Sequence, residues 1–228
     1  MICDVISQLR SELGNVKLMA VSKTRTLSEV QMAFDCGQRL FGENHVQEIE
    51  AKFDPDANPF ASSVQCEMIG HLQKNKVRAA VRLSSRIDSV DSLALARKID
   101  SEAASLGKVM PILIELNTSG EDAKTGFASE EEAAAAIDEI ILMNNIRIEG
   151  FLTVGPVLCT VGTSQWESKT HQSFASLRAF RDRMQSSHSE LDLSELSMGM
   201  THDWKIAVSE GSTMVRIGTL IFGERDYS

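Results

Sequence analysis

A lysine at the end of a short apolar run is the residue of this chain whose position first suggests chemistry. Residues 18–21 form a nearly continuous apolar run, typical of a parallel strand covered on both faces, and Lys23 follows just after it. A partly desolvated lysine at the carboxyl end of such a strand loses its proton more readily and attacks a carbonyl group as a neutral amine. The alternative interpretation is an ordinary solvated lysine at a strand end.

Two stretches near the C-terminus predict a phosphate site. Residues 197–203 and 215–219 each place a glycine and small or hydroxyl-bearing residues after an apolar run. In parallel barrels the loops after strands seven and eight often bind phosphate through backbone N–H groups. Arg216 belongs to the last run, and because the first and last strands of a closed barrel are neighbours, we expect Lys23 and Arg216 in one pocket. One ligand that fits this combination is pyridoxal 5′-phosphate (PLP). The lysine amine suits its carbonyl group, the loops suit its phosphate, and the arginine lies at the adjacent strand end.

The elements that must position these residues alternate along the chain. Residues 2–13 have apolar positions at helical spacing and predict an N-terminal helix that ends at Gly14. Thr26 and Glu29 form a capping box, so a helix should start directly after Lys23. The predicted strands cover residues 18–21, 39–43, 64–70, 86–90, 109–116, 146–154, 195–198 and 213–217. Helical patterns separate them, one of them starting at Asp91 as its predicted N-cap.

Eight strands that alternate with helices favour a closed (β/α)8 barrel, the TIM barrel, over an open sheet. Each strand-helix unit takes about 28 residues, and the total of 228 residues approximates the usual barrel length. No Pro/Ser-rich linker or shift of composition divides the chain. We therefore expect one PLP-binding α/β barrel domain over residues 1–228, with the helix of residues 2–13 as an extra N-terminal element.

Composition and charge exclude several function classes. The 43% apolar and 24% charged residues are ordinary for a soluble globule, and the net charge of −9 argues against nucleic acid or an anionic membrane as a partner. No apolar run approaches the roughly 18 residues of a membrane span, and the N-terminus lacks a signal-peptide pattern, which predicts a cytoplasmic protein. Cys3, Cys36, Cys66 and Cys159 have neither C-x-x-C nor metal-ligand spacing. We expect four reduced thiols and no metal site.

Five groups of residues carry a family resemblance that covers nearly the whole chain: residues 20–24, 41–48, 69–76, 120–126, and 196–200 together with 211–219. The chain resembles the YggS/PROSC family of pyridoxal phosphate homeostasis proteins, whose barrel is similar to the N-terminal domain of alanine racemase. This resemblance implies that Lys23 is the Schiff-base lysine and that Arg216 faces the pyridine nitrogen. It also implies that Ser197, Gly218 and Thr219 contribute to the phosphate site, with Asn44 near the cofactor.

Two places depart from the family pattern. The family usually has a histidine where this chain has Glu67, and a Met-Ala-Ile type of sequence where this chain has Leu152, Thr153 and Val154. Neither departure touches Lys23 or the predicted phosphate loops.

The arginine and the missing second domain decide the expected function. A guanidinium disfavours a proton on the pyridine nitrogen, so the ring becomes a weaker electron sink. In the racemases that this chain resembles, a tyrosine of a second domain supplies the second acid/base group, whereas the only tyrosine here is Tyr227. We therefore expect no catalytic residues and a monomeric PLP carrier that buffers cofactor or delivers it to apo-enzymes.

Two further hypotheses stay open. The first is a weak PLP-dependent amino-acid racemase, with a residue such as His202 or a water molecule as its second base. The second is an aldolase in which Lys23 forms its Schiff base with a sugar phosphate. Lys124, after the fifth predicted strand, should lie on the rim of the same pocket, where it is a candidate for cofactor exchange or a solvated lysine without a role.

Overall fold

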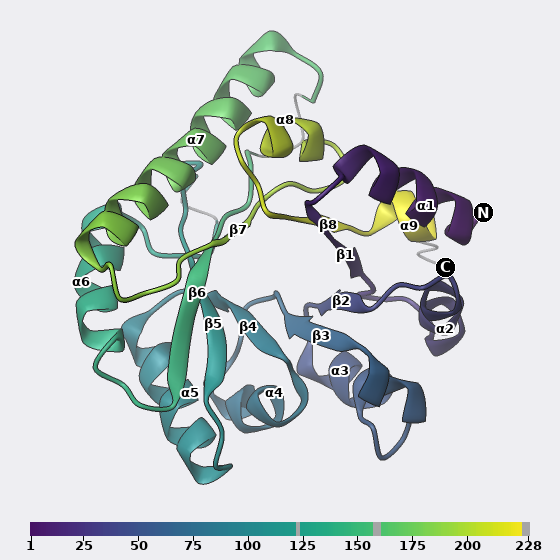
Figure 1. Cartoon of the computed structure of the whole chain (residues 1–228), viewed down its shortest axis with the longest axis horizontal. Coiled ribbons are helices and arrows are strands. Elements are labelled where there is room, and N and C mark those ends of the chain that lie inside the picture. Colours follow the sequence, from purple (N-terminus) through teal and green to yellow (C-terminus); the bar gives the residue numbers. More distant parts are fainter. Residues whose placement is uncertain (122–123, 157–160, 225–228) are drawn as a thin grey trace.

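The computed structural model describes residues 1–121, 124–156 and 161–224, and its parallel strands close into a barrel (Figure 1). Strand order follows the chain, and β1 pairs with both β2 and β8, which confirms the predicted (β/α)8 architecture. The strands are β1 (Lys17–Val21), β2 (Leu40–Glu43), β3 (Gln65–Met68), β4 (Arg86–Val90), β5 (Met110–Glu115), β6 (Ile146–Leu152), β7 (Glu195–Ser197) and β8 (Met214–Ile217).

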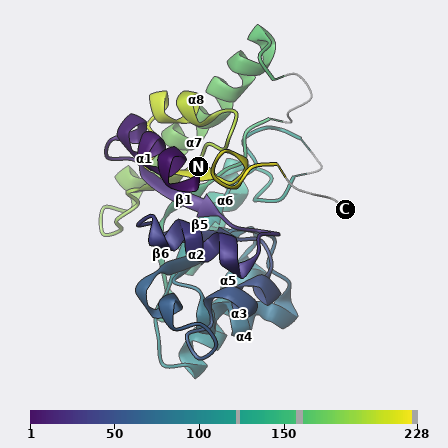
Figure 2. The same cartoon turned by 90° about the vertical axis from the view of Figure 1, so that its right-hand side faces the viewer.

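Helices surround the strands. They are α1 (Ile2–Leu13), α2 (Leu27–Asp35), α3 (Val46–Phe53), α4 (Val77–Leu83), α5 (Leu93–Ser105), α6 (Glu130–Ile140), α7 (Ser164–Ser187), α8 (Trp204–Ser209) and α9 (Thr219–Phe222), with 3-10 helices η1 (Pro59–Ser63) and η2 (Lys74–Lys76). The extra N-terminal helix is confirmed, and in the ring it lies between α8 and α2, where it packs against α9 (Figures 1 and 2).

One predicted helix cap is wrong. Ser92 caps α5, because its hydroxyl accepts from Leu95 N, whereas Asp91 pairs with His71.

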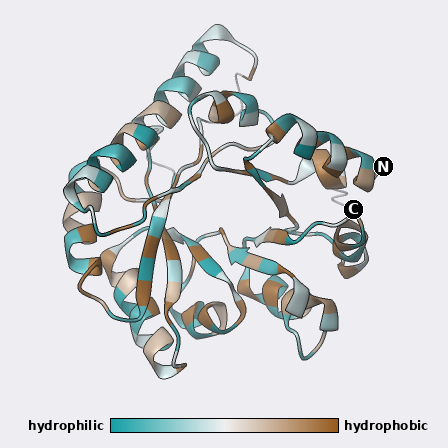
Figure 3. Ribbon diagram, viewed as in Figure 1, coloured by the Kyte–Doolittle hydropathy of each residue, from teal (hydrophilic) through white to brown (hydrophobic). Residues whose placement is uncertain are grey.

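The core has two parts because most strand residues are buried, whichever face of the sheet they are on. A large outer cluster fills the space between the strands and the helices, and a small inner cluster of Met19, Leu113, Leu152 and Met214 fills the middle of the barrel. Along β6 hydrophobic and hydrophilic residues alternate (Figure 3), because successive side chains point to opposite faces of a strand. None of the described helices has the length and apolar character needed to cross a membrane.

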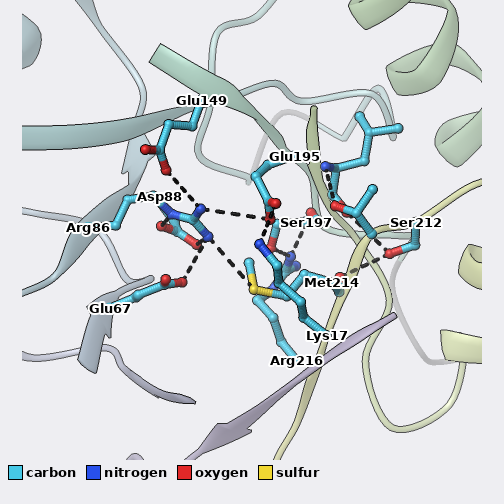
Figure 4. A network of polar contacts seen from close by, with 12 residues as sticks. Lys17, Glu67, Arg86, Asp88, Glu149, Glu195, Ser197, Ser212, Met214 and Arg216 are labelled. Atoms are coloured by element: carbon cyan, nitrogen blue, oxygen red, sulfur yellow. Dashed lines mark hydrogen bonds and ion pairs between the residues drawn. The ribbon is translucent and has the colours of Figure 1, made fainter. Parts of the chain in front are cut away.

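A buried ionic network lies at the amino-terminal end of the barrel (Figure 4). Arg86 of β4 contacts Asp88 at 2.8 Å, Glu67 at 2.9 Å and Glu149 at 3.2 Å, and Glu195 lies 3.8 Å from it. Glu67 is therefore a member of the polar network inside the barrel. Glu67, at which the sequence departs from the family pattern, is not among the residues that line the cavity described below.

The network predicts a specific pH dependence of stability. Burial, with a contribution from Asp88, raises the pKa of Glu67 well above its ordinary value of 4.5, so the folded state binds a proton that the unfolded state has already lost. Stability from this group is present below that ordinary pKa and is lost as the pH rises through the folded-state pKa. We expect the free energy of unfolding of the parent, relative to Glu67→Gln, to fall with rising pH by up to about 1.4 kcal/mol per unit. Urea unfolding of both proteins between pH 4 and 8 measures this difference, and a constant difference contradicts it.

The prediction of four reduced thiols is wrong for one pair. Cys3 of α1 and Cys36, directly after α2, form a disulfide with their Cα atoms 5.0 Å apart. Sequence spacing could not indicate this pair, because the two cysteines are 33 positions apart with a whole strand and helix between them, and only the packing of α1 beside α2 brings the thiols together. Cys66 is a free, buried cysteine as expected, and Cys159 lies outside the described residues.

Reduction of this disulfide is expected to lower stability substantially. The cross-link closes a loop of 33 residues, and the loss of chain entropy in the unfolded state predicts a stabilisation of about 3 to 4 kcal/mol. Urea unfolding with and without dithiothreitol measures the effect. The double variant Cys3→Ser/Cys36→Ser is the control and should unfold at the midpoint of the reduced parent, with no response to the reductant. Equal midpoints for the oxidised and the reduced parent would contradict the expectation.

Candidate functional site

A cavity of about 340 Å³ opens at the carboxyl ends of the strands. Residues from the ends of β1, β2, β3, β6, β7 and β8 meet there, as is usual for the functional face of a (β/α)8 barrel. The lining residues are Val21, Lys23, Arg25, Asn44, Ile69, Leu152, Val154, Met200, Thr201, His202, Asp203, Arg216, Gly218 and Thr219. The cavity therefore combines an apolar wall with cationic and hydroxyl groups.

Lys23 lies in the short link between β1 and α2. The capping box is confirmed, since Thr26 Oγ1 accepts from Glu29 N at 3.3 Å and Glu29 Oε2 accepts from Thr26 N at 2.7 Å. The capping box starts α2 only four residues after Lys23, so the segment between β1 and α2 is short and has little conformational freedom. Strand end and helix start together hold the amine at the mouth of the barrel.

Arg216 provides a fixed positive charge at the base of the cavity. Its side chain is buried inside the barrel and donates to Ser197 O and Ser197 Oγ, both at 2.7 Å, and to Thr153 O at 2.8 Å. Burial lowers the pKa of the Arg216 guanidinium, and the negative charges of Asp88, Asp203 and Glu115 oppose that effect. Arginine does not lose its proton in proteins, so the cavity keeps this cation at all ordinary pH values.

The loops after β7 and β8 supply polar side chains to the cavity lining. Thr201, His202 and Asp203 follow β7, while Gly218 and Thr219 follow β8 and begin α9. A Cβ atom on Gly218 would lie 3.2 Å from Val21 O, so only a small residue lets this turn approach β1 so closely. A short extra helix after the eighth strand is a recurrent feature of phosphate sites in this fold, and the first N–H groups of a helix have no partner within it.

Five of the six predicted cofactor-binding residues line this one cavity: Lys23, Asn44, Arg216, Gly218 and Thr219. Ser197 lies beneath it instead, fully buried, where its hydroxyl and carbonyl groups accept from Arg216. Lys124 is not among the lining residues, and its Nζ donates to Gly155 O and contacts Glu121 Oε2 at 2.7 Å.

Two lining residues carry functional groups that the sequence analysis did not single out. Arg25 donates to Phe222 O at 3.2 Å and to Gly223 O, so it ties the Lys23 link to the end of α9. Asp203 is buried, and burial raises the pKa of its carboxyl group, while the hydrogen bond from Met200 N opposes the rise. No local signal could reveal the Arg25 contacts, because its partners lie almost 200 residues later in the chain.

The fold and the cavity define a (β/α)8 barrel of the alanine racemase N-terminal class. The family model for the alanine racemase N-terminal domain matches residues 4–226. An alanine racemase of Clostridium difficile superimposes with a TM-score of 0.78, at 15% identity, over 100% of this chain and 57% of the racemase. At that identity the likeness shows the fold alone.

Within this class, a narrower set of proteins is much more similar. The pyridoxal phosphate homeostasis protein of Mus musculus is 38% identical over 93% of this chain and 78% of its own length, and that of Vibrio alginolyticus is 34% identical over 94% and 88%. The structure of PipY from Synechococcus elongatus with PLP bound has 34% identity and a TM-score of 0.88, and covers 98% of this chain and 100% of PipY. The chain belongs to the pyridoxal phosphate homeostasis protein family, as the sequence resemblance implied.

Proposed function

We propose that this protein binds PLP as a Schiff base on Lys23 and acts in intracellular PLP homeostasis. The observation that carries the proposal is the meeting of Lys23, Arg216 and the loops after β7 and β8 around one cavity. The relatives named for PLP homeostasis, and the solved relative that holds PLP, support the same ligand.

The donor set of the cavity fits PLP. Lys23 offers an amine for the aldehyde, the buried Arg216 offers a charged donor for the pyridine nitrogen, and the turn at Gly218 and Thr219 offers hydroxyl and backbone donors for the phosphate. A volume of about 340 Å³ is in the range of small-ligand pockets. When bound, the cofactor supplies an electrophilic carbonyl carbon. Lys23 would hold the cofactor through its Nζ atom.

We propose a carrier without robust catalysis. The permanent charge of Arg216 disfavours a protonated pyridine ring, which weakens the electron sink that most PLP reactions need. Tyr227, the only tyrosine of the sequence, lies outside the described residues. In this proposal a monomer in the cytoplasm buffers PLP or delivers it to apo-enzymes, and Lys124 at the rim takes part in exchange.

The test is the visible spectrum of the purified protein, before and after borohydride. The proposal expects a yellow protein whose colour bleaches on reduction, with the added mass on the peptide that contains Lys23. A protein that stays colourless when PLP is added would overturn it, and the sugar-phosphate aldolase would then be the better explanation of the cavity.

A weak amino-acid racemase is the second candidate function, because the cavity also holds an imidazole and a carboxyl group. His202 and the buried Asp203 both line it, and burial raises the pKa of the Asp203 carboxyl group. Incubation of the PLP-loaded protein with L-alanine in deuterated water separates the two functions. Exchange of the α-proton that is lost in Asp203→Asn or His202→Gln supports the racemase, whereas no exchange supports the carrier.

A further inference from the structure

The link that carries Lys23 has a strained backbone. Ser22 to Arg25 form a four-residue turn, which a hydrogen bond from Arg25 N to Ser22 O closes at 3.0 Å. Thr24 has a φ of 63° and is the only non-glycine residue with a positive φ in the part of the chain that the structure describes. A β-branched residue in the left-handed region is strained and persists only where surrounding contacts over-determine it. The contacts that hold Thr24 in this conformation should therefore also determine the position of the neighbouring Lys23.

Three charged residues that do not line the cavity bind this turn. Glu48 Oε2 accepts from Thr24 N at 2.6 Å and lies 2.6 Å from Lys52 Nζ. Lys52 Nζ donates to Ser22 O at 2.8 Å and contacts Glu43 Oε1 at 3.0 Å. Glu43 in turn accepts from Ser22 Oγ at 2.7 Å. The backbone on both sides of Lys23 is thus bound to one ionic group, the Glu43–Lys52–Glu48 cluster.

Stability alone does not account for this cluster. The side chain of Glu43 is 0% exposed and that of Lys52 is 8% exposed, and Glu43 Oε2 is buried without a hydrogen-bond partner. Desolvation of buried ion pairs commonly offsets their attraction, so apolar side chains of similar volume stabilise a core at least as well. The directional contacts to Ser22 O and Thr24 N are what apolar side chains could not supply.

We propose that Glu48, together with Lys52, is a positioning residue that holds the strained turn and thereby directs the Lys23 amine into the cavity. The inference rests on the proposed function, in which this amine is the attachment point of PLP. None of Glu43, Glu48 and Lys52 is among the residues that line the cavity, so they act through the backbone that flanks Lys23.

The test compares two ligands in the variant Glu48→Ala. Pyridoxine 5′-phosphate has an alcohol in place of the aldehyde, so it probes the cavity without bonding to Lys23. We expect the dissociation constant of PLP to rise about tenfold, which corresponds to the free energy that one strained residue typically costs. The dissociation constant of pyridoxine 5′-phosphate should stay within about twofold of the parent value. The fraction of protein fixed by borohydride on Lys23, determined by mass spectrometry at a fixed PLP concentration, should fall in parallel.

Two further variants separate positioning from general structure. Glu48→Gln keeps an acceptor for Thr24 N without the charge opposite Lys52, so a smaller rise of about threefold is expected, and this variant serves if Glu48→Ala yields no folded protein. Thr24→Gly in the Glu48→Ala background should recover part of the loss, because glycine adopts a φ near 63° without strain.

Glu102→Ala is the matched control. Like Glu48, Glu102 forms an ion pair with a lysine four residues later or earlier on its helix, here Lys98 at 2.7 Å, and it also contacts Arg78 at 3.0 Å. It lies on α5 and does not line the cavity. Binding of both ligands should match the parent. An unchanged ratio of the two dissociation constants in Glu48→Ala and Glu48→Gln overturns the inference while the proposed function stands. A parent that forms no covalent link overturns both.

Discussion

Replacing Lys23 with alanine is expected to abolish covalent retention of PLP while the barrel stays folded. Lys23 is the only residue with a primary amine among the described residues that line the cavity. Its side chain is only half-buried, so stability should change by no more than about 0.5 kcal/mol. The borohydride-fixed adduct should fall below about one hundredth of that in the parent, and the remaining reversible binding should be at least about tenfold weaker. Intact-protein mass spectrometry and the visible spectrum measure both effects.

Lys124→Ala is the control for this experiment. Its amine donates to Gly155 O and does not line the cavity, so the same truncation removes a lysine without removing the expected attachment point. This variant should keep the full adduct. An adduct of parental yield in Lys23→Ala would show that another amine holds the cofactor and would contradict the assignment of Lys23.

Replacing Arg216 with leucine is expected to cause the largest loss of stability. The substitution leaves the carbonyl groups of Ser197 and Thr153 without their charged donor inside the barrel. It also removes one of the positive charges that act on Asp88 and Glu115. Breaking a buried, hydrogen-bonded charge arrangement in this way destabilises proteins by about 3 to 5 kcal/mol. Urea unfolding at neutral pH measures the difference.

Two variants bracket this result. Arg216→Lys keeps the charge but loses the planar fork that serves two carbonyl groups, so an intermediate loss of about 1 to 3 kcal/mol is expected. Arg97→Leu removes an arginine whose side chain is 61% exposed and paired with Glu139 at the surface, and it should change stability by less than about 1 kcal/mol. If Arg216→Leu unfolds at the same denaturant concentration as the parent, the buried guanidinium has no structural role.

The architecture could be predicted because its determinants are local. The apolar run at residues 18–21 and the capping box of Thr26 and Glu29 lie within a few residues of each other, and both behave in the structure as their spacing predicts. Because the strands close into a barrel in chain order, β1 must pair with β8, and this pairing brings Lys23 and Arg216 to the same cavity. Helix α9 was not predicted, because its four residues are too few to show helical periodicity.

By itself, the sequence determined the order of strands and helices, the family, and the residues that the strand ends bring to one face, because periodicity, caps and motifs depend on neighbours along the chain. The tertiary structure alone decided the disulfide between Cys3 and Cys36, the place of Ser197 beneath Arg216, and the contacts of Glu48 and Lys52 to the Lys23 link. Each of these depends on the distance and direction between side chains on separate elements, which only the packing of those elements sets.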